Sequence, residues 1–252
     1  MKIIAIIPAR LKSSRLPEKV LADIAGNSML QRVYAIALST ELFDQIIIAT
    51  DSEIVMNHCI KNNMRAMITS AAHQSGTDRI AEVAEMLDSD IIINIQADEP
   101  FIEISTLEAL VELMKNQDVS IGTLTKRIES TESLLDYNTV KLVKDSNNKV
   151  LYFSRQAIPA QRDIPYREWL NNGAYFQHLG VYGFKRKALL EVTSLIPTDL
   201  EKSEKLEQLR WLENGYEVFA ATVKSLSFGI DTQEDLVKAR TYAHSLKFSA
   251  DQ

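Results

Sequence analysis

The sequence is poor in the residues that define several protein classes. Its 252 residues include one cysteine, eight glycines and six prolines. The single Cys59 cannot form an internal disulfide, and no second cysteine stands at metal-ligand spacing, so a disulfide scaffold and a cysteine-based metal site are excluded. A chain of this length can bury a core without such crosslinks. We therefore expect an ordinary globular protein in a reducing compartment.

Long apolar runs and a positive net charge are also absent. The apolar run at residues 3–7 ends at Pro8, too early for the core of an export signal, and no run approaches the roughly 20 residues that span a bilayer. We expect no membrane insertion and a cytoplasmic protein. The formal net charge of -6 repels polyanions, which argues against nucleic acid as a partner. Any phosphate ligand must therefore meet a local group of cations.

The sequence does contain a regular alternation of short apolar runs and amphipathic segments. Runs rich in β-branched residues at 3–7, 46–50 and 91–95 lack polar alternation, which is typical of strands covered on both faces of a parallel sheet. Between these runs, apolar residues recur at the three-to-four spacing of helices. The first ~120 residues thus predict a doubly wound α/β layer.

The pattern changes after residue 124. Residues 140–144 and 149–153 predict a hairpin with a polar turn, and 158–176 shows no periodicity, which predicts a long loop or arm. Later strands are expected at 178–185 and 217–223, and helices at 186–194, 202–214 and 233–243. No linker divides the chain, so we expect a single domain over 1–252 with an inserted subregion at about 125–180.

A group of cations and hydroxyls follows the first expected strand. It comprises Arg10, Lys12, Ser13, Ser14, Arg15 and Lys19. Open α/β sheets bind ligands at the carboxyl ends of their strands, and guanidinium and ammonium groups at this spacing suit several phosphate oxygens. The segment lacks the glycines of a Walker or dinucleotide loop. A phosphate site of another kind is predicted, with a solvated basic loop as the alternative.

Two acids stand where a cation site could form. Asp98 follows the expected strand at 91–95, and Asp231 precedes the last expected helix. Mg²⁺ typically takes one or two carboxylates together with phosphate oxygens and water. The alternatives are that Asp98 caps a turn and that Asp231 is a helix N-cap. From local sequence, a metal ligand and a turn cap are equally favoured for Asp98. For Asp231, capping is favoured unless the two acids bind one cation together.

Five further residues have both a functional and a structural interpretation. Arg79 would stand in the first turn of a helix, where the dipole disfavours a cation, so it either binds a ligand or forms an ion pair. His178 and Tyr182 would share one face of a strand, as a substrate wall or as half-buried core. Glu207 and Gln208 fall on an expected helix and are surface residues by default.

Motifs along nearly the whole chain resemble those of one family. In order, they are residues 6–10, 13–17, 49–51, 74–79, 94–100, 151–159, 178–182, 204–210 and 231–232. Together they resemble the 3-deoxy-D-manno-octulosonate (Kdo) cytidylyltransferases, also called CMP-Kdo synthetases. Any one motif is weak, but their common order is highly specific. The chain departs from the family at Glu18 and Ala97, where the family usually has glycine.

The resemblance implies a fold and an activity. The implied fold is that of the nucleotide-diphospho-sugar transferases: an α/β, Rossmann-like three-layer sandwich with a mixed, mostly parallel sheet. It also implies a homodimer whose contacts use the inserted dimerisation subregion at about 125–180. The implied reaction joins CTP to a 3-deoxy-octulosonic acid, giving CMP-sugar and pyrophosphate for lipopolysaccharide biosynthesis. The anomeric hydroxyl would attack the α-phosphorus in line.

The resemblance also implies roles for individual residues. The nucleotide-binding residues would be Pro8, Ala9, Arg10, Ser13, Ser14, Arg15, Lys19, Arg79 and Gln96. The sugar-acid-binding residues would be Gln96, Arg155, His178, Tyr182, Glu207 and Gln208. Asp98 and Asp231 would bind Mg²⁺, and with Arg15 and Lys19 they would be the catalytic residues.

Three other functions remain open at this point. The first is a cytidylyltransferase for 8-amino-Kdo or a sialic-type acid. The second is a glycosyltransferase that consumes a sugar nucleotide, although such enzymes usually carry Asp-x-Asp where this chain has Asp98, Glu99 and Pro100. The third is a nucleotide-binding module without catalysis, which would be expected to lose a metal acid or a loop cation.

Overall fold

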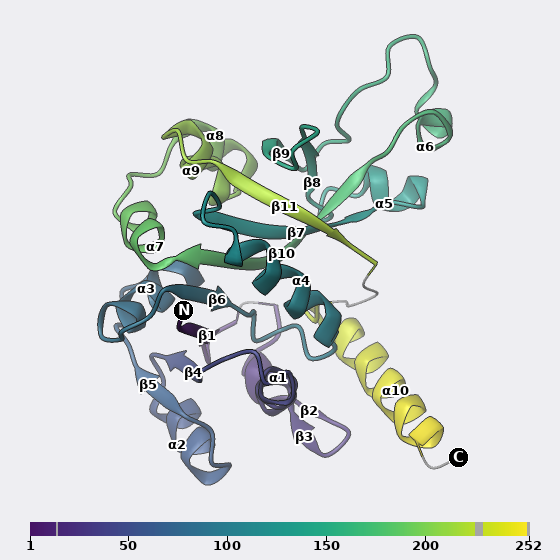
Figure 1. Ribbon diagram of the computed structural model, residues 1–252. Coiled ribbons are helices and arrows are strands. Elements are labelled where there is room, and N and C mark those ends of the chain that lie inside the picture. Colours follow the sequence, from purple (N-terminus) through teal and green to yellow (C-terminus); the bar gives the residue numbers. More distant parts are fainter. Residues whose placement is uncertain (14, 225–228, 251–252) are drawn as a thin grey trace. The chain divides into compact units, whose positions relative to one another are not determined.

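The chain folds into two compact units. The structure is a computed structural model that describes residues 1–13, 15–224 and 229–250 (Figure 1). Unit 1 comprises Met1–Leu107 and Leu226–Gln252, and unit 2 comprises Glu108–Ser225. Ser14, one of the expected nucleotide-binding residues, lies outside the described residues. The expected single domain with a dimerisation subregion at about 125–180 stays a prediction.

Unit 1 is built on a parallel sheet. Its strands are, in spatial order, β6 (Ile91–Asn94), β1 (Ile3–Ala9), β4 (Gln45–Thr50) and β5 (Ala66–Ile68). β1 pairs in parallel with both β4 and β6, and β4 pairs in parallel with β5. All seven residues of β1 are buried, which explains why its sequence shows no polar alternation. The three strands expected in this part of the chain are confirmed.

Helices pack against this sheet and connect its strands. They are α1 (Met29–Ser39), α2 (Glu53–Lys61) and α3 (Gly76–Glu85), with a short turn η1 (Lys19–Leu21) and a small hairpin of β2 (Asp23–Ile24) and β3 (Asn27–Ser28) before α1. Each helix begins after a serine whose side chain accepts a backbone N–H of the first turn: Ser28, Ser52 and Ser75. These caps satisfy amides that would otherwise lack a partner.

The last helix, α10 (Gln233–Ala250), belongs to unit 1 and forms a core with the segment that follows β1. Leu236 and Ala239 of α10 pack in one buried cluster with Leu16, Ile230 and Met29. Leu16 stands beside Arg15 in the chain, and Ile230 stands beside Asp231. One apolar cluster therefore anchors two segments that carry candidate functional residues.

Unit 2 contains a mixed set of strands. β7 (Ile121–Arg127) pairs in parallel with β11 (Val218–Val223) and antiparallel with β10 (Phe176–Lys185), as Figure 1 shows. The expected hairpin is formed by β8 (Lys141–Lys144) and β9 (Val150–Ser154), and β8 also pairs with β10.

The helices of unit 2 are mostly short. They are α4 (Ile104–Lys115), which begins at the end of unit 1, α5 (Thr131–Leu135), η2 (Tyr166–Glu168), α6 (Trp169–Asn172), α7 (Arg186–Thr193), α8 (Asp199–Glu204) and α9 (Gln208–Glu213). Among the helices that the structure describes in either unit, none combines the length and the apolar character needed to cross a bilayer.

The expected continuous helix over 202–214 is wrong. The helix stops after Glu204, and Lys205 takes a left-handed conformation with φ of 52° before α9 starts at Gln208. The expected arm at 158–176 contains η2 and α6, and its Trp169 stacks on Tyr175 in a small core shared with Ile128 and Leu134.

Candidate functional site

A polar cavity of about 380 Å³ lies in unit 1 at the carboxyl ends of β1 and β6. It is lined by Pro8, Arg10, Lys12, Ser13, Arg15, Lys19, Val20, Gly76, Gln96, Ala97, Asp98 and Asp231. The cavity brings the cations that follow β1 together with both candidate metal acids, although Asp231 comes from the far end of the chain. Ala9, by contrast, is fully buried in β1 and is not among the lining residues.

Lys19 lies between the two acids. Its Nζ is 2.6 Å from Asp98 Oδ2 and 3.0 Å from Asp231 Oδ1. Arg15 also reaches Asp231, with 3.1 Å between its guanidinium nitrogen and Oδ1. The Lys19 side chain is only 12% exposed, whereas those of Asp98 and Asp231 are 32% and 47% exposed. Both carboxylates are thus held around one positive charge and remain accessible from the cavity.

The pKa of Lys19 reports the balance of forces at this point. Burial alone would lower the pKa of its ammonium. The attraction to Asp98 and the hydrogen bonds to Asp98 and Asp231 outweigh burial, and the pKa is raised above its ordinary value. Two carboxylates close enough to stabilise one ammonium form a strong local field for cations.

The same two carboxylates fit the chemistry of a magnesium site. Mg²⁺ prefers oxygen ligands and usually needs only one or two protein carboxylates when phosphate oxygens complete its shell. In the part of the chain that the structure describes, no group of three or more His, Cys, Asp or Glu side chains could hold a metal by itself. Asp98 and Asp231 therefore suit a cation shared with a phosphate ligand.

Local contacts explain why the carboxylate of Asp231 is not used to cap α10. Thr232 and Asp235 cap α10: the Thr232 hydroxyl accepts the Asp235 N–H, and Asp235 Oδ2 accepts the N–H groups of Thr232 and Asp231. The carboxylate of Asp231 is left to face Arg15 and Lys19, so the N-cap interpretation of Asp231 is wrong. The Ile230 N–H donates to the Asp98 carbonyl at 3.0 Å, which fixes the two acid-bearing segments side by side.

The backbone at Glu18, where the resemblance leads one to expect glycine, takes a conformation that suits glycine. Glu18 has φ of 52° and ψ of 27°, a left-handed conformation that glycine adopts most easily. Its side chain is exposed, and it borders a neighbouring cavity with Leu11 and Pro17 rather than the cavity that contains Asp98. The anion of Glu18 therefore lies outside the lining of the polar cavity.

Gly76, the first residue of α3, lines the cavity although no expectation from the sequence assigned it a role. A Cβ atom built on Gly76 would lie 3.3 Å from Pro8 Cγ and 4.0 Å from Gln96 Oε1. The helix start approaches β1 this closely because residue 76 has no side chain. The sequence signal for this close approach is a glycine directly after the helix cap Ser75. Lys12, expected among the cations after the first strand, lines the cavity, and so does Val20, to which no expected role was assigned.

Arg79 lies in a buried polar network rather than in the cavity lining. Its side chain is fully buried, one terminal nitrogen is 3.0 Å from Asp51 Oδ2, and the other donates to the Thr69 hydroxyl at 2.5 Å. The structure thus gives Arg79 the ion pair that the sequence offered as one alternative. Its contact with a nucleotide stays a prediction.

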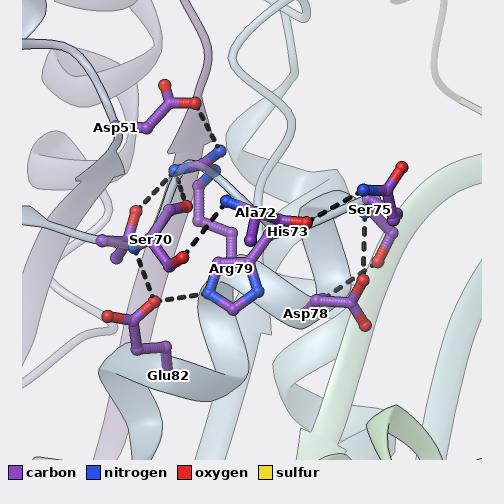
Figure 2. A network of polar contacts seen from close by, with 10 residues as sticks. Asp51, Ser70, Ala72, His73, Ser75, Asp78, Arg79 and Glu82 are labelled. Carbon is purple, nitrogen blue, oxygen red and sulfur yellow. Dashed lines mark hydrogen bonds and ion pairs between the residues drawn. The ribbon is translucent and has the colours of Figure 1, made fainter.

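Figure 2 shows that this network fastens the loop between β5 and α3. Glu82 accepts the Ser70 N–H at 2.9 Å and contacts the His73 ring, and the Ala72 N–H donates to the Ser70 hydroxyl. The hydrogen bond from the Ser70 backbone and the contact with His73 lower the pKa of Glu82. The loop that leads to Gly76 is therefore fixed by side chains of α3.

Several residues expected at the sugar acid lie in unit 2. His178 and Tyr182 share a face of β10, as expected, with ring centroids 5.2 Å apart. The bulge between Leu179 and Tyr182 adds two residues to β10. Because two is an even number, the alternation of side chains still places both residues on one face. Burial lowers the pKa of His178 to about 3, so the imidazole is neutral at physiological pH.

Tyr182 is 8% exposed and stands edge-on to Trp211, with centroids 5.1 Å apart. Within the described residues its hydroxyl has no hydrogen-bond partner. Burial and the nearby charge of Glu207 raise its pKa well above the ordinary value. The hydroxyl is therefore a neutral hydrogen-bonding group. Gln208, expected at the surface, is instead only 6% exposed.

Arg155 lines a second cavity, of about 370 Å³, in unit 2. Its guanidinium donates to three backbone carbonyls: Nε to Glu204 at 2.8 Å, one terminal nitrogen to Tyr137 at 3.0 Å and the other to Lys205 at 3.5 Å. The Glu204 carboxylate in turn accepts the Arg155 N–H at 2.9 Å. Arg155 is thus held in one orientation by contacts within its own unit.

Comparisons of the sequence identify similar proteins along nearly the full chain. A family model described as cytidylyltransferase matches residues 4–224. A 3-deoxy-manno-octulosonate cytidylyltransferase of Flavobacterium johnsoniae is 41% identical over 245 residues, which is 95% of this chain and 98% of that protein. The protein of the same name from Francisella tularensis subsp. novicida is 43% identical over 240 residues, covering 93% and 96%.

Comparison of the structures confirms the expected fold class. The fold is similar to that of CMP:2-keto-3-deoxy-manno-octonic acid synthetase complexed with CTP, with a TM-score of 0.91, 34% sequence identity and coverage of 97% of this chain and 99% of that one. A 4-diphosphocytidyl-2C-methyl-D-erythritol synthase from Anaerococcus prevotii shares the fold alone, at a TM-score of 0.63 and 14% identity over 96% and 98% of the two chains.

Proposed function

The chain belongs to the cytidylyltransferase family, and we propose that it couples CTP to 3-deoxy-D-manno-octulosonic acid or a close derivative, producing CMP-sugar and pyrophosphate. The names of the relatives favour this acid over an amino-substituted or sialic-type acid. The presence of both acids and of the loop cations argues against a silent nucleotide-binding module.

The observation that carries the proposal is the arrangement around Lys19. A triphosphate needs several positive groups, and a metal-bound phosphate needs accessible carboxylates. Arg15, Lys19, Asp98 and Asp231 supply both within one cavity in unit 1. Such a cavity fits a nucleoside triphosphate better than a neutral ligand.

The chemistry would be a substitution at the α-phosphorus of CTP. The anomeric oxygen of the sugar acid forms a bond to this phosphorus, its proton leaves to solvent or to a base, and the bond to the pyrophosphate oxygen breaks. Arg15 and Lys19 would stabilise the charge that develops on the leaving pyrophosphate. Positioning and charge neutralisation carry most of such a transfer.

Mg²⁺ held by Asp98 and Asp231 would supply Lewis-acid stabilisation of the phosphate charge. Lys19 forms ion pairs with both carboxylates, and Arg15 adds a second positive charge beside Asp231. The mixed set of cations and anions would thus keep the two acids close together before a ligand arrives.

The resemblance assigns recognition of the sugar acid to Arg155, His178, Tyr182, Glu207 and Gln208, and it also assigns Gln96. His178 and the Tyr182 hydroxyl can exchange hydrogen bonds with sugar hydroxyls, and Arg155 can bind a carboxylate. Glu207 and Gln208 add an acceptor and an amide. A neutral His178 suits this role because it can accept or donate a hydrogen bond without repelling a cation.

The cellular setting is part of the proposal. We expect a cytoplasmic homodimer in lipopolysaccharide biosynthesis, with contacts through the subregion at about 125–180. The buried, unpaired thiol of Cys59 fits a reducing compartment.

A pyrophosphate-release assay tests the function. The purified protein is mixed with CTP, Mg²⁺ and a panel of eight- and nine-carbon sugar acids, with UTP as the control nucleotide. We expect release with CTP and the eight-carbon 3-deoxy acid. Absence of release with every acid would overturn the enzyme proposal, and equal rates with a nine-carbon acid would overturn the proposed substrate.

A further inference from the structure

Lys141 is a lysine in an unusual place. It lies on β8, pairs with Ser154 of β9 and with Gln177 of β10, and its side chain has no exposed surface. Lysine is rarely fully buried, because an ammonium loses its hydration there. An apolar side chain would fill the same position without that cost, so the ammonium has a use that its alkyl chain does not.

The contacts of the Lys141 ammonium identify this use. Its Nζ donates to three backbone carbonyls: Asp136 at 2.8 Å, Thr139 at 2.6 Å and Arg155. An ammonium has three N–H donors, so the three carbonyls satisfy it completely. Lys141 therefore ties the turn over residues 136–139 to the backbone of Arg155.

The turn and Arg155 are also joined by a second contact. The carbonyl of Tyr137, within the same turn, accepts a hydrogen bond from the Arg155 guanidinium at 3.0 Å. Lys141 thus fixes both the main chain of Arg155 and a backbone group that orients its side chain. On the other side, Glu204 accepts the Arg155 N–H and, through its carbonyl, the Nε–H.

These contacts leave the guanidinium ready for an anion. A guanidinium has five N–H donors, one on Nε and two on each terminal nitrogen. Within the described residues, these contacts engage each nitrogen once, so the second N–H on each terminal nitrogen has no hydrogen-bond acceptor. A fork with two donors matches a carboxylate when its orientation is fixed in advance.

We propose that Lys141 is the positioning residue for Arg155, holding its guanidinium in the orientation that binds the carboxylate of the sugar acid. The inference rests on the proposed function, because it takes the sugar acid as the ligand of Arg155. Lys141 does not touch the ligand. It acts through the 136–139 turn and the Arg155 main chain.

Lys144 provides a matched control on the same strand. Its ammonium donates to Asn148 Oδ1 at 2.7 Å, the Ala220 carbonyl at 3.0 Å and the Thr222 hydroxyl at 2.8 Å. It therefore has a comparable set of three acceptors, but none belongs to Arg155 or to the 136–139 turn. Replacing either lysine by methionine removes the ammonium and keeps most of the alkyl chain.

The experiment is steady-state kinetics of Lys141→Met, Lys144→Met and Arg155→Ala, and of the double variant Lys141→Met with Arg155→Ala. We expect Lys141→Met to raise the KM for the sugar acid about 10-fold while the KM for CTP changes less than about 2-fold. Lys144→Met should change neither KM by more than about 2-fold. In the Arg155→Ala background, Lys141→Met should add less than about 2-fold, because its route of action is gone.

A milder variant covers the case in which Lys141→Met does not fold. The Asp136 carboxylate accepts the Asn138 N–H at 2.9 Å and the Thr139 hydroxyl at 3.2 Å, so Asp136→Ala loosens the same turn from its exposed side. We expect a rise of about 3-fold in the KM for the sugar acid, which again disappears in the Arg155→Ala background.

The outcomes separate this inference from the proposed function. If the wild type releases no pyrophosphate with any sugar acid, the function is overturned and the role of Lys141 with it. If the wild type is active but the folded Lys141→Met, or Asp136→Ala in its place, keeps the wild-type KM for the sugar acid, only the positioning role is overturned. Effects that multiply in the double variant would also overturn it.

Discussion

The two units use charge in different ways. In unit 1, two charges of the polar cavity are accessible: the side chains of Arg15 and Asp231 are 61% and 47% exposed. In unit 2, Lys141 is fully buried and its donors are consumed by backbone carbonyls, while His178 is neutral. Arg15 and Asp231 can thus be shared with a ligand, whereas the charge of Lys141 holds the chain. Arg79 of unit 1 resembles Lys141 in this respect, since it is buried and paired with Asp51.

The largest effect is expected from the two acids of unit 1. Asp98→Asn and Asp231→Asn each remove a charged oxygen ligand, and each should reduce turnover by at least about 100-fold. The thermal unfolding midpoint should change little, because both side chains are partly exposed. Pyrophosphate release and Mn²⁺ binding followed by electron paramagnetic resonance are the measurements.

Asp88→Asn is the matched control for this comparison, because Asp88 is a fully exposed acid of the same unit. It should keep wild-type turnover and Mn²⁺ binding. Near-normal activity of both Asp98→Asn and Asp231→Asn would contradict the assignment of the metal site.

A smaller effect is expected from the accessible cation Arg15. Arg15→Ala should weaken CTP binding about 10- to 100-fold, as expected for the loss of a hydrogen bond between charged groups, and leave sugar-acid binding within about 2-fold. Calorimetric titration with CTP measures the affinity. Arg65→Ala, an exposed arginine outside the cavity lining, serves as the control. Unchanged affinity of Arg15→Ala for CTP would refute its role.

The neutral His178 of unit 2 should appear in the pH dependence of stability. Its pKa is about 3 in the folded protein against an ordinary value of 6.5, so the unfolded state binds more protons between these values. The free energy of unfolding should therefore fall as the pH is lowered through this window, with a contribution of up to about 1.4 kcal/mol per pH unit. His178→Phe should remove the contribution. Urea unfolding at several pH values measures it, and identical slopes for the two proteins would contradict the neutral state.

The smallest effect is expected at Glu18. Glu18→Gly relieves a left-handed backbone but increases the freedom of the unfolded chain, so the net gain in stability should be only about 0.5 kcal/mol. Glu41, with φ of 54°, is a second glutamate in this conformation and lies outside the cavity lining. Glu41→Gly should give a similar gain. Guanidinium unfolding checks both, and a loss of stability in Glu18→Gly would show that the side chain makes a stabilising contact.

Much of the fold followed from local patterns in the sequence. Unbroken runs rich in β-branched residues predicted the buried strands of unit 1, and a polar turn predicted the β8–β9 hairpin. No local pattern predicted the break between α8 and α9, because the residue with the left-handed backbone there is Lys205 and not a glycine. It is stabilised by contacts distant in the chain, in which Glu204 and Lys205 accept hydrogen bonds from Arg155.

The candidate site was predictable in part. The cations after β1 could be read from their spacing, but local sequence favoured a capping role for Asp231. The pairing of Asp98 with Asp231 depends on a backbone hydrogen bond between segments more than a hundred residues apart, which no local pattern encodes. The ion pair of Arg79 with Asp51 likewise needs the sheet to bring two helix starts together. The resemblance to a family supplied the acid pair where local physics could not.

The apolar cluster of Leu16, Ile230 and Leu236 gives the C-terminal helix a part in the rigidity of the cavity. The backbone amides of a segment exchange with solvent when the core against which that segment packs unfolds locally. The segment after β1 that carries Arg15 shares this core with α10. Local unfolding of α10 would therefore also remove the packing partners of Leu16, beside Arg15, and of Ile230, beside Asp231. In hydrogen–deuterium exchange, the two segments would then behave as one cooperative unit, and the last helix of the chain would set how long the charges of the cavity stay assembled.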